Sequence, residues 1–181
     1  MRLKLISPEE MSADQRQIYD ESIAGKRGSA PPPMMAWLNS AEMARHASRL
    51  GAVLRFETSF PPKLSEIAIL VTARHWTSHY EWYAHKKLAL ADGLEPAVIE
   101  DIRQRRAPRF DDPKARMIYD VAKSLHEGHG LAQGLYDDAV KLLGERGLVE
   151  IIGLCGYYTL VSMTLNAFEV DLPGGEVSEL T

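Results

Sequence analysis

A long apolar segment near the end of the chain, residues 148–170, places the strongest constraint on how this protein can fold. Because it is apolar on most of its helical faces, it must be surrounded either by lipid or by protein. Glu150, Asn166 and Glu169 interrupt it, together with several Gly and Thr residues, and a lipid-spanning helix would carry fewer such groups. The segment therefore predicts a central core helix, and it gives no reason to expect a membrane as a partner.

Proline and glycine divide the remaining chain into segments that are typical of helices. We expect about seven helices, little strand and one all-α domain over residues 1–181, because no linker or repeat separates the segments. The triple proline at 31–33 predicts a loop over 26–33, and the tail 171–181 is expected to be loose or to dock on a neighbour. The expected helices cover about 7–25, a segment capped by Asn39 or Ser40, 61–93, 95–108, 112–128, 136–143 and 148–170.

Charge and cysteine content exclude several classes of protein. The 21 basic residues do not outnumber the 25 acidic ones, and the net charge is −4, so the chain has no positive surplus for binding nucleic acid. The single cysteine, Cys155, excludes an internal disulfide, a CxxC redox pair and a multi-cysteine zinc site. The N-terminal segment becomes acidic before a signal-type apolar stretch can form, which predicts a cytoplasmic protein.

Chemically capable side chains concentrate in residues 75–85. Three of the six histidines, two of the three tryptophans and two of the seven tyrosines fall within these eleven residues. Such groups are costly to bury unless they satisfy one another, so the segment is the first candidate for a site. His75 and His79 are four residues apart, but no HExxH order is present and we expect no metal site.

Glu66 lies just before this segment, on the same expected helical region. Its helical neighbours Ile69, Leu70 and Ala73 are apolar, and burial there would raise the pKa of its carboxyl group toward values useful for acid–base catalysis. The alternative is that Glu66 occupies the first turn of a helix after Pro61-Pro62 and simply favours the helix dipole.

Glu81 and His85 form the second candidate pair. Their spacing of four residues places both on one helical face, where a carboxylate can orient an imidazole for proton transfer. Ser78 and Glu81 also match a capping box, and in that alternative His85 is an ordinary core histidine. The capping box further predicts that the segment 61–93 is two helices with a break near Thr77-Ser78.

Three further side chains complete the expected site. Tyr80, with Ser78, could donate a hydrogen bond to an oxyanion, and Trp82 could form an aromatic wall for a small unsaturated ligand. Arg74 is the nearest cation and could receive a substrate carboxylate, although a surface salt bridge is the commoner role of such a residue.

The spacing of these residues resembles the carboxymuconolactone decarboxylase family, whose superfamily includes the alkylhydroperoxidase D proteins. The redox branch carries Glu, eleven residues, Cys, two residues, Cys, three residues and His. Here Glu66 is followed at the same spacings by Ser78, Glu81 and His85, so the Glu and the His are kept and both cysteines are replaced. The resemblance is best over residues 61–94.

This resemblance implies an all-α, alkylhydroperoxidase D-like fold with a central helical hairpin. It also implies a homo-oligomer, a trimer or hexamer, with active sites near subunit contacts. The missing thiols exclude the disulfide chemistry of the redox branch, which disfavours peroxiredoxin-type or antioxidant activity.

The leading functional hypothesis is a cofactor-independent decarboxylase or related lyase acting on a small unsaturated lactone or keto acid. His85 would transfer the proton, Glu81 would orient the His85 ring, and Glu66 would be a second acid–base group or a support for His85. The alternative is a ligand-binding or assembly protein of the same fold, in which the three side chains form a structural network. A cavity of a few hundred Å³ with His85 in its wall would favour the enzyme.

Overall fold

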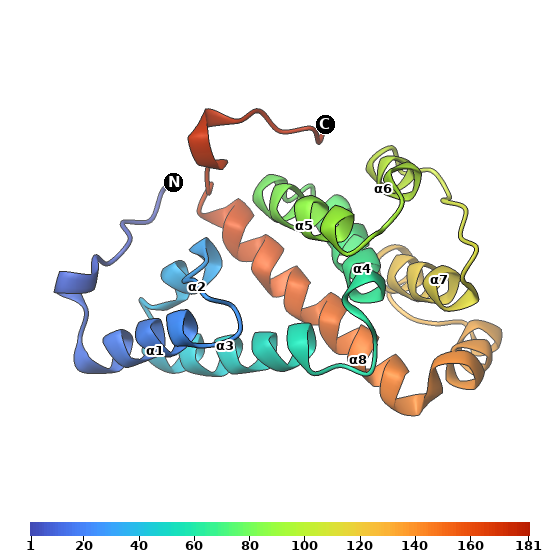
Figure 1. The fold of residues 1–181 in the computed structure, drawn as a ribbon, viewed down its shortest axis with the longest axis horizontal. Helices are drawn as coiled ribbons and strands as arrows, with labels where there is room; N and C mark the ends of the chain where they lie inside the picture. Colours follow the sequence, from blue (N-terminus) through green and yellow to red (C-terminus); the bar gives the residue numbers. More distant parts are fainter.

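The computed structural model describes all of residues 1–181 and contains helices but no strand (Figure 1). The all-α prediction is therefore confirmed. Short 3₁₀ turns lie at Pro8–Glu10 and Pro173–Gly175. The eight α-helices are α1 (Ala13–Ala24), α2 (Pro32–Trp37), α3 (Ala41–Phe56), α4 (Pro62–His75), α5 (His79–Ala91), α6 (Pro96–Arg103), α7 (Pro113–Gly128) and α8 (Gln133–Ala167).

Helix α8 crosses the middle of the molecule, with α1–α3 on one side and α4–α7 on the other (Figure 1). It packs against α2, α3, α4, α5 and α7, so the apolar segment is the core helix that its sequence predicts. Gly144 has a non-helical backbone (φ 75°, ψ 163°) and divides α8 close to the predicted boundary between two helices. By length and apolarity alone α8 could cross a membrane, but 56% of its most apolar window is buried inside this fold.

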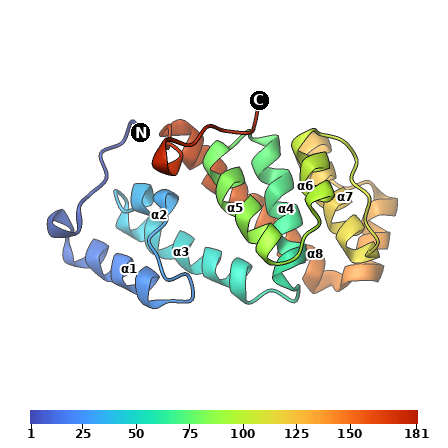
Figure 2. The ribbon, with the colours of Figure 1, turned by 45° about the horizontal axis from the view of Figure 1, so that its top comes forward.

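Helices α4 and α5 form the predicted hairpin, and they lie side by side in Figure 2. The predicted break is confirmed, because the chain turns at Thr77, which has a positive φ of 46°. Helix α4 is buried from Leu64 through Arg74 and packs against α5, α7 and α8. The first turn of α5 is thereby held beside the core.

Four helices begin with a proline in the first turn, where the missing N–H has no intrahelical partner to lose. This effect corrects the predicted loop over 26–33, because Pro32 begins α2. The expected helix over 7–25 begins later than predicted, because a 3₁₀ turn ends at Glu10 and Ser12 caps α1, but it ends at Gly25 as predicted. Helix α6 stops at Arg103 rather than near Pro108, and Arg105 just beyond it has a left-handed backbone (φ 58°).

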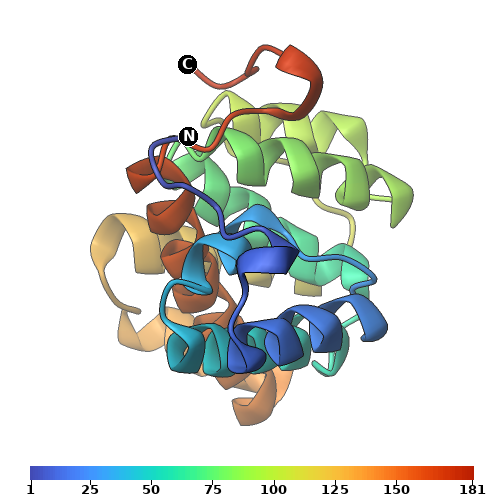
Figure 3. The same ribbon diagram turned by 90° about the vertical axis from the view of Figure 1, so that its left-hand side faces the viewer.

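The C-terminal tail packs on helix α5 of its own chain and lies near the N-terminus (Figure 3). The Tyr83 hydroxyl donates a hydrogen bond to Glu176 at 2.9 Å, and the Lys86 ammonium donates to both oxygens of Glu179 at 2.5 and 2.7 Å. Leu180 is buried, which anchors the end of the tail. The tail is thus docked on its own chain rather than loose.

Candidate active site

The hairpin brings Glu66, Glu81 and His85 into direct contact. The Nδ1 atom of His85 lies 2.7 Å from Oε2 of Glu66, and its Nε2 atom lies 2.8 Å from Oε1 of Glu81. Each of the three residues is only 4% exposed. Glu66 comes from α4, whereas Glu81 and His85 lie one turn apart on α5. The imidazole is therefore held between two buried carboxylates.

The two carboxylates determine the protonation state of His85. Desolvation by burial lowers the pKa of His85, but the negative charges of Glu66 and Glu81 and their hydrogen bonds outweigh it and raise the pKa to about 9. At neutral pH the ring is an imidazolium that donates from both nitrogens. The three side chains together then carry a net charge of −1.

The capping box predicted at the start of α5 does not form. Ser78 is the N-cap residue by its backbone, but its side chain accepts no capping hydrogen bond, and Glu81 contacts His85 instead. The Ser78 hydroxyl is buried without a hydrogen-bond partner. The competing interpretation of Glu81 as a capping residue is therefore wrong. The Ser78 amide, which a capping carboxylate would accept from, already donates to the Ala73 carbonyl at 2.9 Å, so the Glu81 carboxylate binds the buried imidazolium instead.

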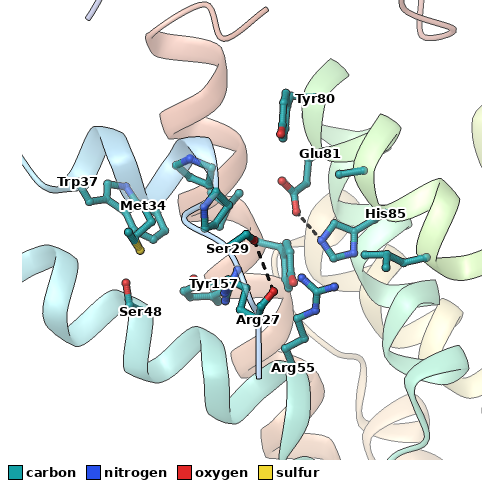
Figure 4. A pocket seen from close by; sticks show the side chains of 16 residues that line it. Arg27, Ser29, Met34, Trp37, Ser48, Arg55, Tyr80, Glu81, His85 and Tyr157 are labelled. Atoms are coloured by element: carbon teal, nitrogen blue, oxygen red, sulfur yellow. Dashed lines mark hydrogen bonds and ion pairs between the residues drawn. The ribbon is translucent and has the colours of Figure 1, made fainter. Parts of the chain in front are cut away.

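A cavity of about 230 Å³ adjoins this triad, and Glu81 and His85 form part of its wall. Four aromatic side chains and two arginines also line this space, and all of them except Tyr80 come from outside the α4–α5 hairpin (Figure 4). Tyr158 meets the His85 ring edge to face, with ring centroids 4.9 Å apart. Burial raises the pKa of Tyr158 well above its usual value, so its hydroxyl stays a neutral donor. The aromatic residues are Trp37, Tyr80, Tyr157 and Tyr158, and the arginines are Arg27 and Arg55.

The expected site residues separate into two groups. Glu81, His85 and Tyr80 line the cavity, and Glu66 contacts His85 without lining it. Ser78 is buried and also does not line it.

Arg74 and Trp82 lie elsewhere, which corrects their expected place in the site. The Arg74 guanidinium donates hydrogen bonds to the backbone oxygens of Arg103 (2.6 Å) and Thr181 (3.1 Å), so it stabilises the docked tail. Trp82 is on the tail-facing side of α5, beside Glu176 and Glu179.

Five cavity residues could not be identified from the sequence: Arg27, Trp37, Arg55, Tyr157 and Tyr158. The two adjacent tyrosines in an otherwise apolar helix are the only sequence signal for a cavity there, because a buried phenol hydroxyl usually needs a hydrogen-bond partner. The arginines carry no such signal, since they lie in segments that only the tertiary structure brings to the hairpin.

The single thiol, Cys155, does not belong to this site. Cys155 is buried and does not line the cavity, and burial raises the pKa of its thiol to about 12. Such a thiol is almost entirely protonated at neutral pH and is a poor nucleophile. No group of three or more His, Cys, Asp or Glu side chains is arranged to bind a metal ion.

Comparison with known proteins identifies the architecture. No protein-family model matches the chain, and no curated protein matches it. Among solved structures, an alkylhydroperoxidase AhpD core from Ralstonia eutropha JMP134, described as an uncharacterized peroxidase-related protein, has a TM-score of 0.80 at 14% identity, covering 98% of this chain and 97% of its own. An uncharacterized peroxidase-related protein from Silicibacter sp. TM1040 has a TM-score of 0.76 at 16% identity, covering 96% and 91%.

A third similar structure is a variant of the debrominase Bmp8 in complex with 2,3,4-tribromopyrrole. Its TM-score is 0.76 at 10% identity, and the match covers 97% of this chain and 93% of that protein. At these identities the likeness concerns the backbone arrangement. The chain therefore has the alkylhydroperoxidase D-like fold, and its hairpin brings Glu66, Glu81 and His85 into contact.

Proposed function

We propose that this protein is a cofactor-independent enzyme that transfers a proton during decarboxylation, or a related lyase reaction, of a small unsaturated lactone or keto acid. One observation carries the proposal: a buried Glu66–His85–Glu81 triad, of which Glu81 and His85 form part of the wall of a cavity of about 230 Å³. A proton donor with its pKa tuned by buried neighbours, beside a space large enough for a small ring, is typical of an active site.

The hydrogen bonds indicate how the proton would move. Both nitrogens of His85 are occupied by carboxylates, so the imidazolium cannot reach a substrate without releasing one of them. Glu81 lines the cavity and Glu66 does not. We therefore assign proton delivery to the Glu81–His85 pair, with Glu66 retaining the ring as a positioning residue. This order gives Glu81 a larger role than simple orientation.

The reaction needs no redox step. The bond between the substrate carbon and its carboxylate breaks, CO₂ leaves, and the electron pair moves into the conjugated carbonyl as an enolate. The Glu81–His85 pair then gives a proton to carbon, and solvent returns one proton to the pair. The Tyr158 hydroxyl, neutral at working pH, is a suitable donor to the enolate oxygen.

The cavity walls support a flat substrate. Aromatic side chains stack on planar unsaturated rings, and they exclude water from a carboxylate that must lose its charge. The debrominase of the same fold is in complex with a small flat ring, tribromopyrrole, and a ligand of similar dimensions suits this volume.

The two other hypotheses have weaker support. A thiol peroxidase would depend on Cys155, whose buried and protonated thiol has no resolving partner. A ligand-binding protein without catalysis accounts for the cavity, but it gives no reason to bury two carboxylates against one imidazole at its wall.

The test is turnover of a panel of unsaturated lactones and keto acids in deuterium oxide, followed by CO₂ release and by mass spectrometry of the product. We expect one deuterium at the carbon that lost CO₂, and a loss of about 10²–10⁴-fold in kcat for Glu81→Gln and His85→Ala. Glu42→Gln is the matched control, because Glu42 pairs with His46 at the same i, i+4 spacing on the exposed surface. Full turnover by Glu81→Gln would overturn the assignment, and binding without turnover would favour the ligand-binding protein.

A further inference from the structure

Two arginines contribute to the wall of the cavity. Arg27 lies in the loop between α1 and α2, and Arg55 lies in the last turn of α3. Both line the cavity, and neither takes part in an ion pair, although ion pairs are frequent elsewhere on this molecule. Figure 4 shows Arg27 and Arg55 among the side chains that line the cavity, together with Tyr157 and His85. Two partly buried, like-charged groups facing one space repel each other unless an anion lies between them.

The local structure directs Arg27 toward this space. A turn precedes α2, in which the Gly28 amide donates a hydrogen bond to the Gly25 carbonyl at 3.0 Å, and Gly28 has a positive φ of 67°. The Ser22 hydroxyl donates to the Ser29 carbonyl at 2.7 Å, which fixes the far side of the turn to α1. The loop is therefore held in a shape that presents Arg27 to the cavity.

We propose that Arg27 and Arg55 bind a carboxylate of the substrate that stays on the molecule throughout the reaction. A planar carboxylate offers two oxygens, which match the paired donors of guanidinium groups. This inference rests on the proposed function for the reaction that follows, but anion recognition by the two arginines can be measured separately.

Charge balance explains why the bound carboxylate is not the one that leaves. The triad has a charge of −1 with His85 protonated, and the arginines add two positive charges, so the site has a net charge of +1. An arginine on the leaving carboxylate would stabilise the starting state and slow the loss of CO₂. The leaving carboxylate therefore belongs beside the negatively charged Glu81 and out of contact with the two guanidinium groups.

The substrate class that follows is a small, flat, unsaturated dicarboxylate. Bound as a dianion, it brings the site from +1 to −1. Loss of CO₂ and uptake of one proton convert it to a monoanion, and the site then becomes neutral. The reaction thus relieves an excess of negative charge at the end of the cavity where Glu81 lies.

The experiment compares two non-reactive probes on the full chain, furan-2-carboxylate and its neutral isostere furan-2-carboxamide, by isothermal titration calorimetry. We expect the carboxylate to bind more tightly to the wild type and its affinity to fall with added salt. Arg55→Met and Arg27→Met should each weaken carboxylate binding about 10–100-fold, since a hydrogen bond to a charged group is lost, and leave carboxamide binding unchanged. Arg55→Lys should restore part of the loss.

Arg49→Met is the matched control, because Arg49 is an exposed arginine of the same helix that does not line the cavity. Equal affinities for the two probes, no binding of the carboxylate, or full binding by both methionine variants would each overturn the inference. A purely structural role for the arginines would lower the melting temperature and the affinity for both probes. Arginine-dependent binding with no turnover of any lactone or keto acid would preserve this inference and refute the proposed reaction.

Discussion

Raising the pH from 6 to 9 should remove the stabilisation that His85 gives to the folded protein. Burial lowers its pKa, the two neighbouring carboxylates raise it more strongly, and the folded-state value is about 9 against an ordinary 6.5. Because the folded pKa is the higher one, the stabilisation is fully present below pH 6.5 and is lost as the pH rises toward and through 9. A difference of this size corresponds to about 3 kcal/mol in the free energy of unfolding.

The assay is urea denaturation followed by circular dichroism at half-unit steps of pH. The series stops at pH 9, because the ordinary pKa of a thiol is 9.0 and the raised pKa of Cys155 would add its own destabilisation above that point. Glu81→Gln keeps the shape of the side chain but removes one of the two charges that hold the proton. In that variant the fall between pH 6 and 9 should be clearly smaller, and NMR titration of the imidazole should show a lower pKa.

The control is Glu42→Gln, which removes the carboxylate from an exposed Glu–His pair of the same spacing. An exposed pair contributes little to stability, so this variant should follow the wild-type curve. A wild-type free energy of unfolding that stays constant between pH 6 and 9 would refute the reasoning, as would an equally steep fall in Glu81→Gln. Either result would mean that the triad does not hold a proton on His85.

Three further outcomes follow from packing, burial and capping. Gly51→Ala should lower the free energy of unfolding, followed in a thermal melt, by about 1–3 kcal/mol, because the new Cβ would overlap the ring of Tyr157. Gly156→Ala should raise it by about 0.5–1 kcal/mol, because this helical position has open space. Equal effects of the two substitutions would contradict the packing described. Alkylation of Cys155 by iodoacetamide at pH 7 should be far slower in the folded protein than after denaturation, and rapid labelling would show that the thiol is accessible. Asp112→Ala should lower the free energy of unfolding by about 1 kcal/mol, since its side chain caps α7, and an unchanged urea midpoint would argue against the cap.

Local signals in the sequence were sufficient for most of the architecture. The Pro61-Pro62 start, the break near Thr77 and the Asp112-Pro113 start follow from the chemistry of single residues, and the structure has all three. The triple proline does not form the predicted loop. A proline breaks the interior of a helix but is favoured in the first turn, and Pro32 lies in the first turn of α2.

Only part of the candidate site can be predicted from local signals in the sequence. Glu66, Glu81 and His85 are within twenty residues of one another, so helical periodicity and the hairpin bring them together. Whether Glu81 caps α5 or binds His85 depends on the presence of Glu66 on the other side of the ring. That choice is made by tertiary packing, which no local pattern contains.

The cavity lies where three separate stretches of the chain meet. Helices α4 and α5 supply Glu66, Glu81 and His85, the segments before them supply Arg27 and Arg55, and α8 supplies two tyrosines. Under the proposed function, substitutions in the loop ahead of α2 or at the end of α3 would change which compounds bind, while the α4–α5 hairpin keeps its three contacting side chains. Related proteins of this fold would then differ in the compounds that they bind while they share the same hairpin.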